Sequence, residues 1–82
     1  MFRITDNKGF QITFPNGWTV SVQFGHYNYC ANYHEFEYRP SPDAEIAAWK
    51  GDEWYDFGND TVKGYVSPAE VLAFMNMIAA KE

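Results

Sequence analysis

Two runs of alternating apolar and polar residues, joined by a turn signal, constrain this fold more than any other feature of the chain. Residues 10–14 and 18–24 place a large apolar side chain at every second position, and Pro15-Asn16-Gly17 separates them. A period of two is typical of a strand that buries one face, and Asn and Gly accept the positive φ angles of a hairpin turn. With the alternating residues 2–5 ahead of them, residues 2–24 are predicted to form a three-stranded antiparallel meander.

The second half of the chain contains a segment that fits two structures. Residues 44–49 are rich in Ala and Glu, as in a helix. The segment has only six residues before the turn at Lys50-Gly51-Asp52, a length that suits a strand. We favour a strand, because residues 54–57 after the turn would be its natural hairpin partner. Residues 61–66 are expected to form another short strand, which Gly64 kinks or bulges.

The C-terminal segment carries the signals of a helix. Ser67 is a suitable N-cap, Pro68 takes the first helical position, and Glu70 takes the third, as in a capping box. Apolar residues then recur at helical spacing, which predicts a helix over 67–81 that covers the apolar face of the sheet. The predicted fold class is therefore α+β. Residues 1–82 form a single domain, a curved antiparallel sheet of five or six strands with one C-terminal helix.

Charge and composition exclude several classes of protein. Eleven acidic and six basic residues give a net charge of −5, and the basic residues are spread along the chain. Direct nucleic-acid binding is not expected, because a phosphate-binding surface needs clustered Lys or Arg. The single cysteine allows no intrachain disulfide, which is typical of a reducing compartment. No apolar run reaches the length of a signal peptide or a membrane span, so we expect a cytoplasmic protein with no membrane contact.

Residues 25–43 break the alternation and are predicted to form a long aromatic loop. Tyr and Arg are enriched among the anchor residues of interfaces, and Asn adds adaptable hydrogen bonds. The candidate contact residues are Tyr27, Tyr29, Tyr33, Phe36, Tyr38 and Arg39. Two alternatives stay open. The rings could plug the open end of the sheet, or they could stack on a nucleotide base while Arg39 holds its phosphate.

The same loop contains the spacing His26-x3-Cys30-x3-His34, whose residue types are zinc ligands. A fourth ligand would have to be Glu35, Glu37 or Asp43. We favour two surface histidines and a half-buried thiol, and we predict no metal and no cofactor. Cys30 could also pair with a histidine as a nucleophile and base, but no cysteine-nucleophile signature surrounds it. The chain is therefore predicted not to be an enzyme.

A second candidate site is acidic. Asp52, Glu53, Asp56 and Asp60 fall close together around a predicted hairpin, and we call residues 52–60 the acidic segment. Its carboxylates suit a solvated turn that blocks edge-to-edge pairing of strands. They equally suit a charged patch for a basic partner, which could imitate nucleic-acid phosphates. Asp52, Glu53 and Asp56 are the binding candidates.

Four runs of sequence resemble small proteins encoded by bacteriophages and prophages: residues 9–25, Asn28-Tyr29-Cys30, residues 44–49 and residues 64–71. The resemblance carries no motif with a known activity. It implies a phage accessory protein in the bacterial cytoplasm, and small phage proteins of this kind often inhibit host defence, as anti-CRISPR proteins do.

The expected function is therefore that of a non-enzymatic binding protein that inhibits a bacterial host or defence protein through residues 26–39 and the acidic segment. An alternative is a protein, for example a homodimer, that sequesters a nucleotide or a small signal molecule. A small enzyme that uses His26, Cys30 or His34 is the third hypothesis.

Overall fold

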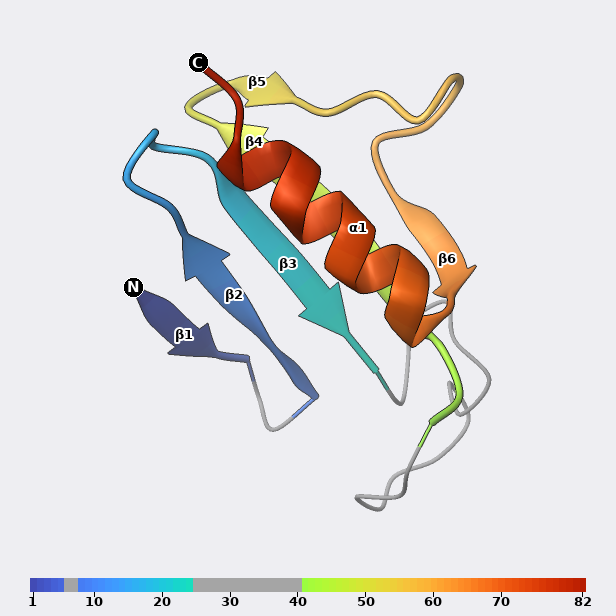
Figure 1. The fold of residues 1–82 in the computed structure, drawn as a ribbon. Coiled ribbons are helices and arrows are strands. Elements are labelled where there is room, and N and C mark those ends of the chain that lie inside the picture. Colours follow the sequence, from blue (N-terminus) through green and yellow to red (C-terminus); the bar gives the residue numbers. More distant parts are fainter. Residues whose placement is uncertain (6–7, 25–40) are drawn as a thin grey trace.

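The computed structural model describes residues 1–5, 8–24 and 41–82. These ranges form six strands and one helix, as Figure 1 shows: β1 (Phe2–Ile4), β2 (Gly9–Thr13), β3 (Thr19–Gln23), β4 (Ala44–Lys50), β5 (Glu53–Trp54), β6 (Lys63–Val66) and α1 (Pro68–Ala79). The predicted α+β class, an antiparallel sheet with a C-terminal helix, is confirmed. The described ranges contain no helix with the length and apolar character that crossing a membrane requires.

The strands form one antiparallel sheet that does not close on itself. Strands β1, β2, β3 and β4 lie in that order, and β5 and β6 both pair with the far edge of β4. β5 lies opposite Trp49–Lys50, whereas β6 lies opposite Ala44–Ile46. Residues 53–66 therefore act as one edge strand that leaves the sheet between its two ends. The strand predicted for residues 44–49 is confirmed as β4.

The register gives the sheet one apolar face. Phe2 lies opposite Ile12 and Ile4 opposite Phe10, and these positions continue across β3 and β4. Helix α1 lies over β3 and β4 on this face and leaves β1 and β2 uncovered (Figure 1). The buried core accordingly lies beneath the helix and consists of Trp18, Val20, Val22, Ala44, Ile46, Ala48, Val66, Phe74 and Ile78.

The turn between β2 and β3 also holds the helix. Gly17 has a φ of 88°, and its N–H donates to the Phe14 carbonyl at 2.9 Å, so Pro-Asn-Gly forms the predicted tight turn. The Asn16 side-chain amide donates to the carbonyl oxygens of Ile78 at 2.9 Å and Lys81 at 2.9 Å. One side chain thus joins the β2–β3 turn to the C-terminal end of α1, where the Ile78 carbonyl also accepts from the Lys81 N–H at 3.2 Å.

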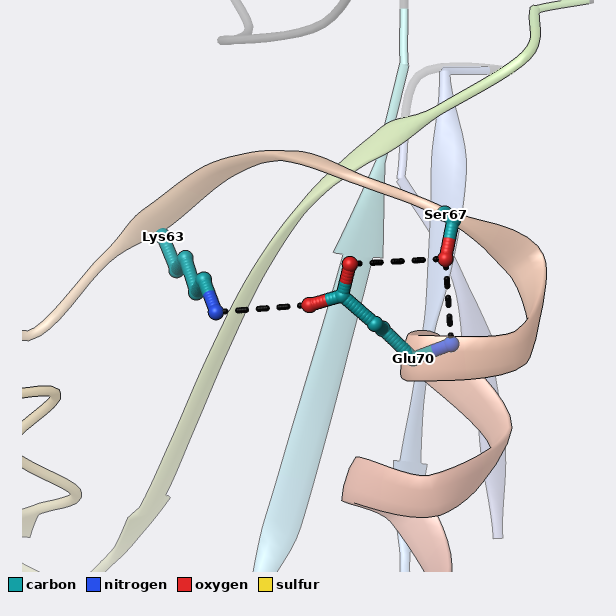
Figure 2. Close-up of polar contacts among 3 residues, drawn as sticks. All are labelled: Lys63, Ser67 and Glu70. Atoms are coloured by element: carbon teal, nitrogen blue, oxygen red, sulfur yellow. Dashed lines mark hydrogen bonds and ion pairs between the residues drawn. The ribbon is translucent and has the colours of Figure 1, made fainter.

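Ser67 caps the N-terminal end of α1 as the sequence predicts, but the Glu70 carboxylate accepts from the Ser67 hydroxyl, whereas in a capping box it accepts from the backbone N–H. The Glu70 backbone N–H donates to the Ser67 hydroxyl oxygen at 3.3 Å, and that hydroxyl donates to the Glu70 carboxylate at 3.5 Å (Figure 2). Lys63 on β6 reaches the other carboxylate oxygen at 3.4 Å. The carboxylate therefore links the edge strand to the first turn of the helix, where the helix dipole favours a negative charge.

Two details differ from the expected second hairpin. β5 ends at Trp54, and the following Tyr55 and Phe57 rings turn toward Phe74 of α1, at centroid distances of 5.3 and 5.2 Å. The Tyr55 N–H still donates to the Ala48 carbonyl of β4 at 2.9 Å, and beyond it the packing of the two rings against the helix replaces a longer ladder. The register does shift where Gly64 predicted a bulge, but the positive φ, 56°, belongs to the neighbouring Tyr65.

Candidate functional site

The acidic segment lies at the open edge formed by β5. Asp52, Glu53 and Asp56 are all exposed, and Glu53 pairs with Lys50 across the β4–β5 ladder. Residues 51–62 contain four carboxylates and no basic side chain. The predicted acidic residues are therefore gathered on one surface segment, which carries most of the excess negative charge of the chain.

Local hydrogen bonds fix the shape of this segment. The Asp56 carboxylate accepts from the Gly58 N–H at 2.7 Å, and the Asp60 carboxylate accepts from the Val62 N–H at 3.2 Å. The Phe57 N–H donates to the Asp60 carbonyl at 2.8 Å, which closes the turn. Each of the two carboxylate hydrogen bonds engages one oxygen of its carboxylate. The Asp56 and Asp60 carboxylates are therefore held in place before any partner arrives.

Two aromatic rings anchor the acidic segment to the helix. Tyr55 and Phe57 contact each other with ring centroids 4.9 Å apart, and both contact Phe74 in the core. On the opposite face of the sheet, Trp54 packs against Trp49 at 4.8 Å and keeps 47% of its surface exposed. An exposed Trp between Glu53 and Asp56 is a side-chain type common in interface anchors.

The remaining predicted site residues lie outside the described ranges. They are Tyr27, Tyr29, Tyr33, Phe36, Tyr38 and Arg39 of the contact set and His26, Cys30 and His34 of the metal set. In residues 1–5, 8–24 and 41–82, no three His, Cys, Asp or Glu side chains are placed to hold a metal ion together.

An apolar groove beside α1 was not predicted from the sequence. It encloses about 300 Å³ between the helix and strands β2, β3, β4 and β6, and Ser41 and Asp43 also line it. Val71, Leu72 and Met75 form its helix wall, and Phe10 and Val22 lie on the sheet side. The Phe10 ring also meets the exposed Phe2 ring at 6.3 Å, so the apolar surface continues from the groove onto β1. The near-absence of polar residues from the helix sequence was the signal that could have indicated this surface.

A small polar pocket lies on the other face of the sheet. It encloses about 200 Å³ and is lined by Met1, Arg3, Gln11, Thr13, Thr19 and Trp49. The register brings these residues together from β1, β2, β3 and β4, because they point away from the helix. The Thr13 and Thr19 hydroxyls are hydrogen-bonded at 2.8 Å. A guanidinium, an indole and several hydroxyl and amide groups therefore share one pocket.

Comparison of the chain with protein-family models, with curated proteins and with solved structures found no match.

Proposed function

We propose that this protein is a non-enzymatic binding protein that acts by protein–protein contact, with the acidic segment as its contact surface for a basic protein. The observation that carries the proposal is the fixed geometry of the segment. Two of its four carboxylates, those of Asp56 and Asp60, accept backbone hydrogen bonds within a turn that Tyr55 and Phe57 anchor to the core. The other two, those of Asp52 and Glu53, are exposed at the adjoining β4–β5 hairpin. A preorganised surface loses little conformational entropy on binding.

The charge of the segment supports a partner with a basic face. Opposite potentials accelerate the encounter between two proteins and select against partners of the wrong sign. The exposed Trp54 ring beside Glu53 adds apolar area to this charged contact. The resemblance to phage-encoded proteins supports a bacterial host or defence protein as the partner, inhibited by contact in the cytoplasm.

Affinity capture from a bacterial lysate tests this function. The wild-type protein is compared with a triple variant, Asp52→Asn, Glu53→Gln and Asp56→Asn, which removes three charges at nearly constant shape. Asn at position 56 can still accept from the Gly58 N–H through its amide oxygen, so the turn is retained. We expect the wild type to capture a basic protein and the triple variant to lose at least about tenfold in affinity.

The control is Glu82→Gln, which removes a charge at the exposed C-terminus. It should capture the same protein as the wild type. Equal capture by the triple variant would show that the acidic segment is not the contact, and the absence of any specific captured protein would contradict the function itself.

The polar pocket favours a second candidate function, the binding of a nucleotide. Arg3 could contact a phosphate and Trp49 a base, the two interactions by which proteins hold single nucleotides. A nucleotide at 100 times its Kd would stabilise the protein by about 2.7 kcal/mol and raise its melting temperature. Arg3→Gln should abolish that rise. A panel of nucleotides that leaves the melting temperature unchanged would exclude this candidate.

A further inference from the structure

The apolar face of the sheet is wider than the helix that covers it. Helix α1 lies over β3 and β4, whereas β1 and β2 carry apolar side chains on the same face with no element above them in the described ranges (Figure 1). Phe2 and Ile4 on β1 are 72% and 76% exposed. Phe10 and Ile12 on β2 are half-buried. These four residues, which we call the bare strip, form an apolar floor beside the helix.

The side of α1 that faces away from the sheet is also apolar. Between positions 68 and 80 the only polar side chains are Glu70 and Asn76. Glu70 is engaged by Ser67 and Lys63 at the N-terminal end. Leu72 is 58% exposed, and Ala69 and Ala73 are exposed beside it. A helix that is apolar around most of its surface is usually buried on most sides. The crest of α1, formed by Ala69, Leu72, Ala73 and Asn76, has no element packed on it within residues 1–5, 8–24 and 41–82.

The bare strip has the dimensions of one helix. Two neighbouring strands span about 10 Å, which matches the diameter of a helix with its side chains. The five residues of β2 extend over about 17 Å, and the twelve residues of α1 over about 18 Å. The chain therefore carries both an apolar site for one helix and an apolar helix of matching length.

We propose that this face binds a second copy of the chain, with the crest of each α1 seated on the bare strip of the other copy. A two-fold axis makes the exchange reciprocal, so that two helices lie side by side between two sheets and no apolar face remains to recruit a third copy. The groove beside Leu72 and Phe10 then lies inside the interface. This surface is separate from the acidic segment.

The available area fits a stable dimer. The exposed parts of Phe2, Ile4 and Leu72 alone provide on the order of 400 Å², within the range of a functional surface patch. Phe10, Ile12, Met75 and the helix crest extend this toward the roughly 800 Å² per partner of a standard interface. The four residues of the bare strip and the crest residues Ala69, Leu72, Ala73 and Asn76 are uncharged, so their contact buries no ion, and Asp43 is the charged residue at the rim of the adjoining groove.

Two single variants of the full chain test the proposal by light scattering coupled to size exclusion. Wild type should elute as a dimer of about 19 kDa, twice the 9.5 kDa of one chain. Leu72→Glu and Ile4→Lys each place an unpaired charge in the interface and should weaken the dimer more than about 100-fold, giving monomers. Both positions are largely exposed in the single chain, so the variants should fold, as circular dichroism will verify.

A mixture of the two variants provides the decisive result. In reciprocal docking, the carboxylate introduced at position 72 of one copy meets the ammonium introduced at position 4 of the other, and the second half of the interface stays native. The mixture should therefore form a 1:1 heterodimer although each variant alone is monomeric. A dimer joined edge to edge through β1 would instead survive Leu72→Glu, and that outcome would overturn the proposal.

The matched control is Met77→Glu. Met77 is 43% exposed but lies on the flank of α1 that faces Tyr55, 4.0 Å from its hydroxyl, so this variant should remain dimeric. If Leu72→Glu fails to fold, Ala73→Glu on the crest replaces it in both experiments. A wild type that stays monomeric at high micromolar concentration overturns the inference. A monomeric wild type would say nothing about the acidic segment, which the capture experiment from lysate tests separately.

Discussion

Asn16 does more for this fold than a turn residue usually does. Its amide group donates to carbonyl oxygens at the end of α1, while its side-chain oxygen accepts from the Trp18 N–H at 3.0 Å. The same side chain therefore shapes the β2–β3 turn and closes the helix. These hydrogen bonds make the position of the helix depend on the hairpin, although Ile78 lies 62 positions after Asn16 in the chain.

Replacement of Asn16 should reveal this double role. Asn16→Ala removes the side-chain donor to the part-buried Ile78 and Lys81 carbonyls, of which Ile78 keeps the Lys81 N–H, so we expect the free energy of unfolding to fall by about 1–2 kcal/mol in urea denaturation. Asn16→Asp should cost more, because a carboxylate cannot donate and meets the negative end of the helix dipole. Asn59→Ala, at an exposed turn, should change stability by less than about 0.5 kcal/mol. A similar small change at position 16 would contradict the capping role.

Tyr65 shows a limit of residue-by-residue prediction. A Gly at position 64 indicated a bulge, yet the left-handed conformation falls on the tyrosine next to it. Non-glycine residues adopt this region at a cost of about 1–2 kcal/mol. The pairing of Val66 with Ala44 fixes the end of β6 and imposes the strain, and that pairing is not a local property of the sequence.

The elements themselves follow closely from local patterns. The alternation in residues 10–14 and 18–24, the Pro-Asn-Gly turn and the capped helix all appear as predicted, because each depends on neighbours within a few positions. The edge segment does not follow. Tyr55 still donates its N–H to Ala48 of β4 at 2.9 Å, but the chain leaves the sheet after it, because Phe74 offers the Tyr55 and Phe57 rings a contact that only the packed helix provides.

The N-cap of α1 gives a prediction for a single element. Ser67→Ala removes the acceptor of the Glu70 N–H and should lower the free energy of unfolding by about 1 kcal/mol in thermal or urea denaturation. Lys63→Gln breaks only an exposed ion pair and should cost at most about 0.5 kcal/mol. If the lysine variant proved the more damaging, the ion pair rather than the cap would hold the helix to β6.

The molecule as a whole has two proposed contact surfaces of opposite character. The acidic segment is charged, whereas the bare strip and the helix crest are uncharged and apolar. Salt should therefore act on them in opposite directions. Two copies that each carry a net charge of −5 repel one another at long range, while a basic partner is attracted to the acidic segment.

This difference can be measured by raising the salt concentration from about 0.05 to 0.5 M, which shortens the Debye length several-fold. Self-association, followed by sedimentation, should strengthen because repulsion is screened and apolar burial is not. Capture of the basic partner should weaken over the same range. Self-association that weakens with salt would point to an electrostatic interface and contradict docking on the bare strip.

As with the fold, some candidate sites could be predicted from local sequence and others required the tertiary structure. The acidic residues could be named from the sequence, because four carboxylates within one short segment stay together in any fold. The polar pocket could not, because Arg3 and Trp49 meet only through the order of the strands. The bare strip also could not, because it depends on how many strands one helix covers.

The sequence by itself determined the strands, the helix and the charge of the acidic segment, since periodicity, capping and composition act over a few residues. Only the tertiary structure decided that α1 lies over β3 and β4, that Asn16 closes it, and that Phe2 and Ile4 stay exposed. These three features depend on contacts between residues far apart in the chain. The width of a helix and the spacing of strands set how many strands one helix can cover.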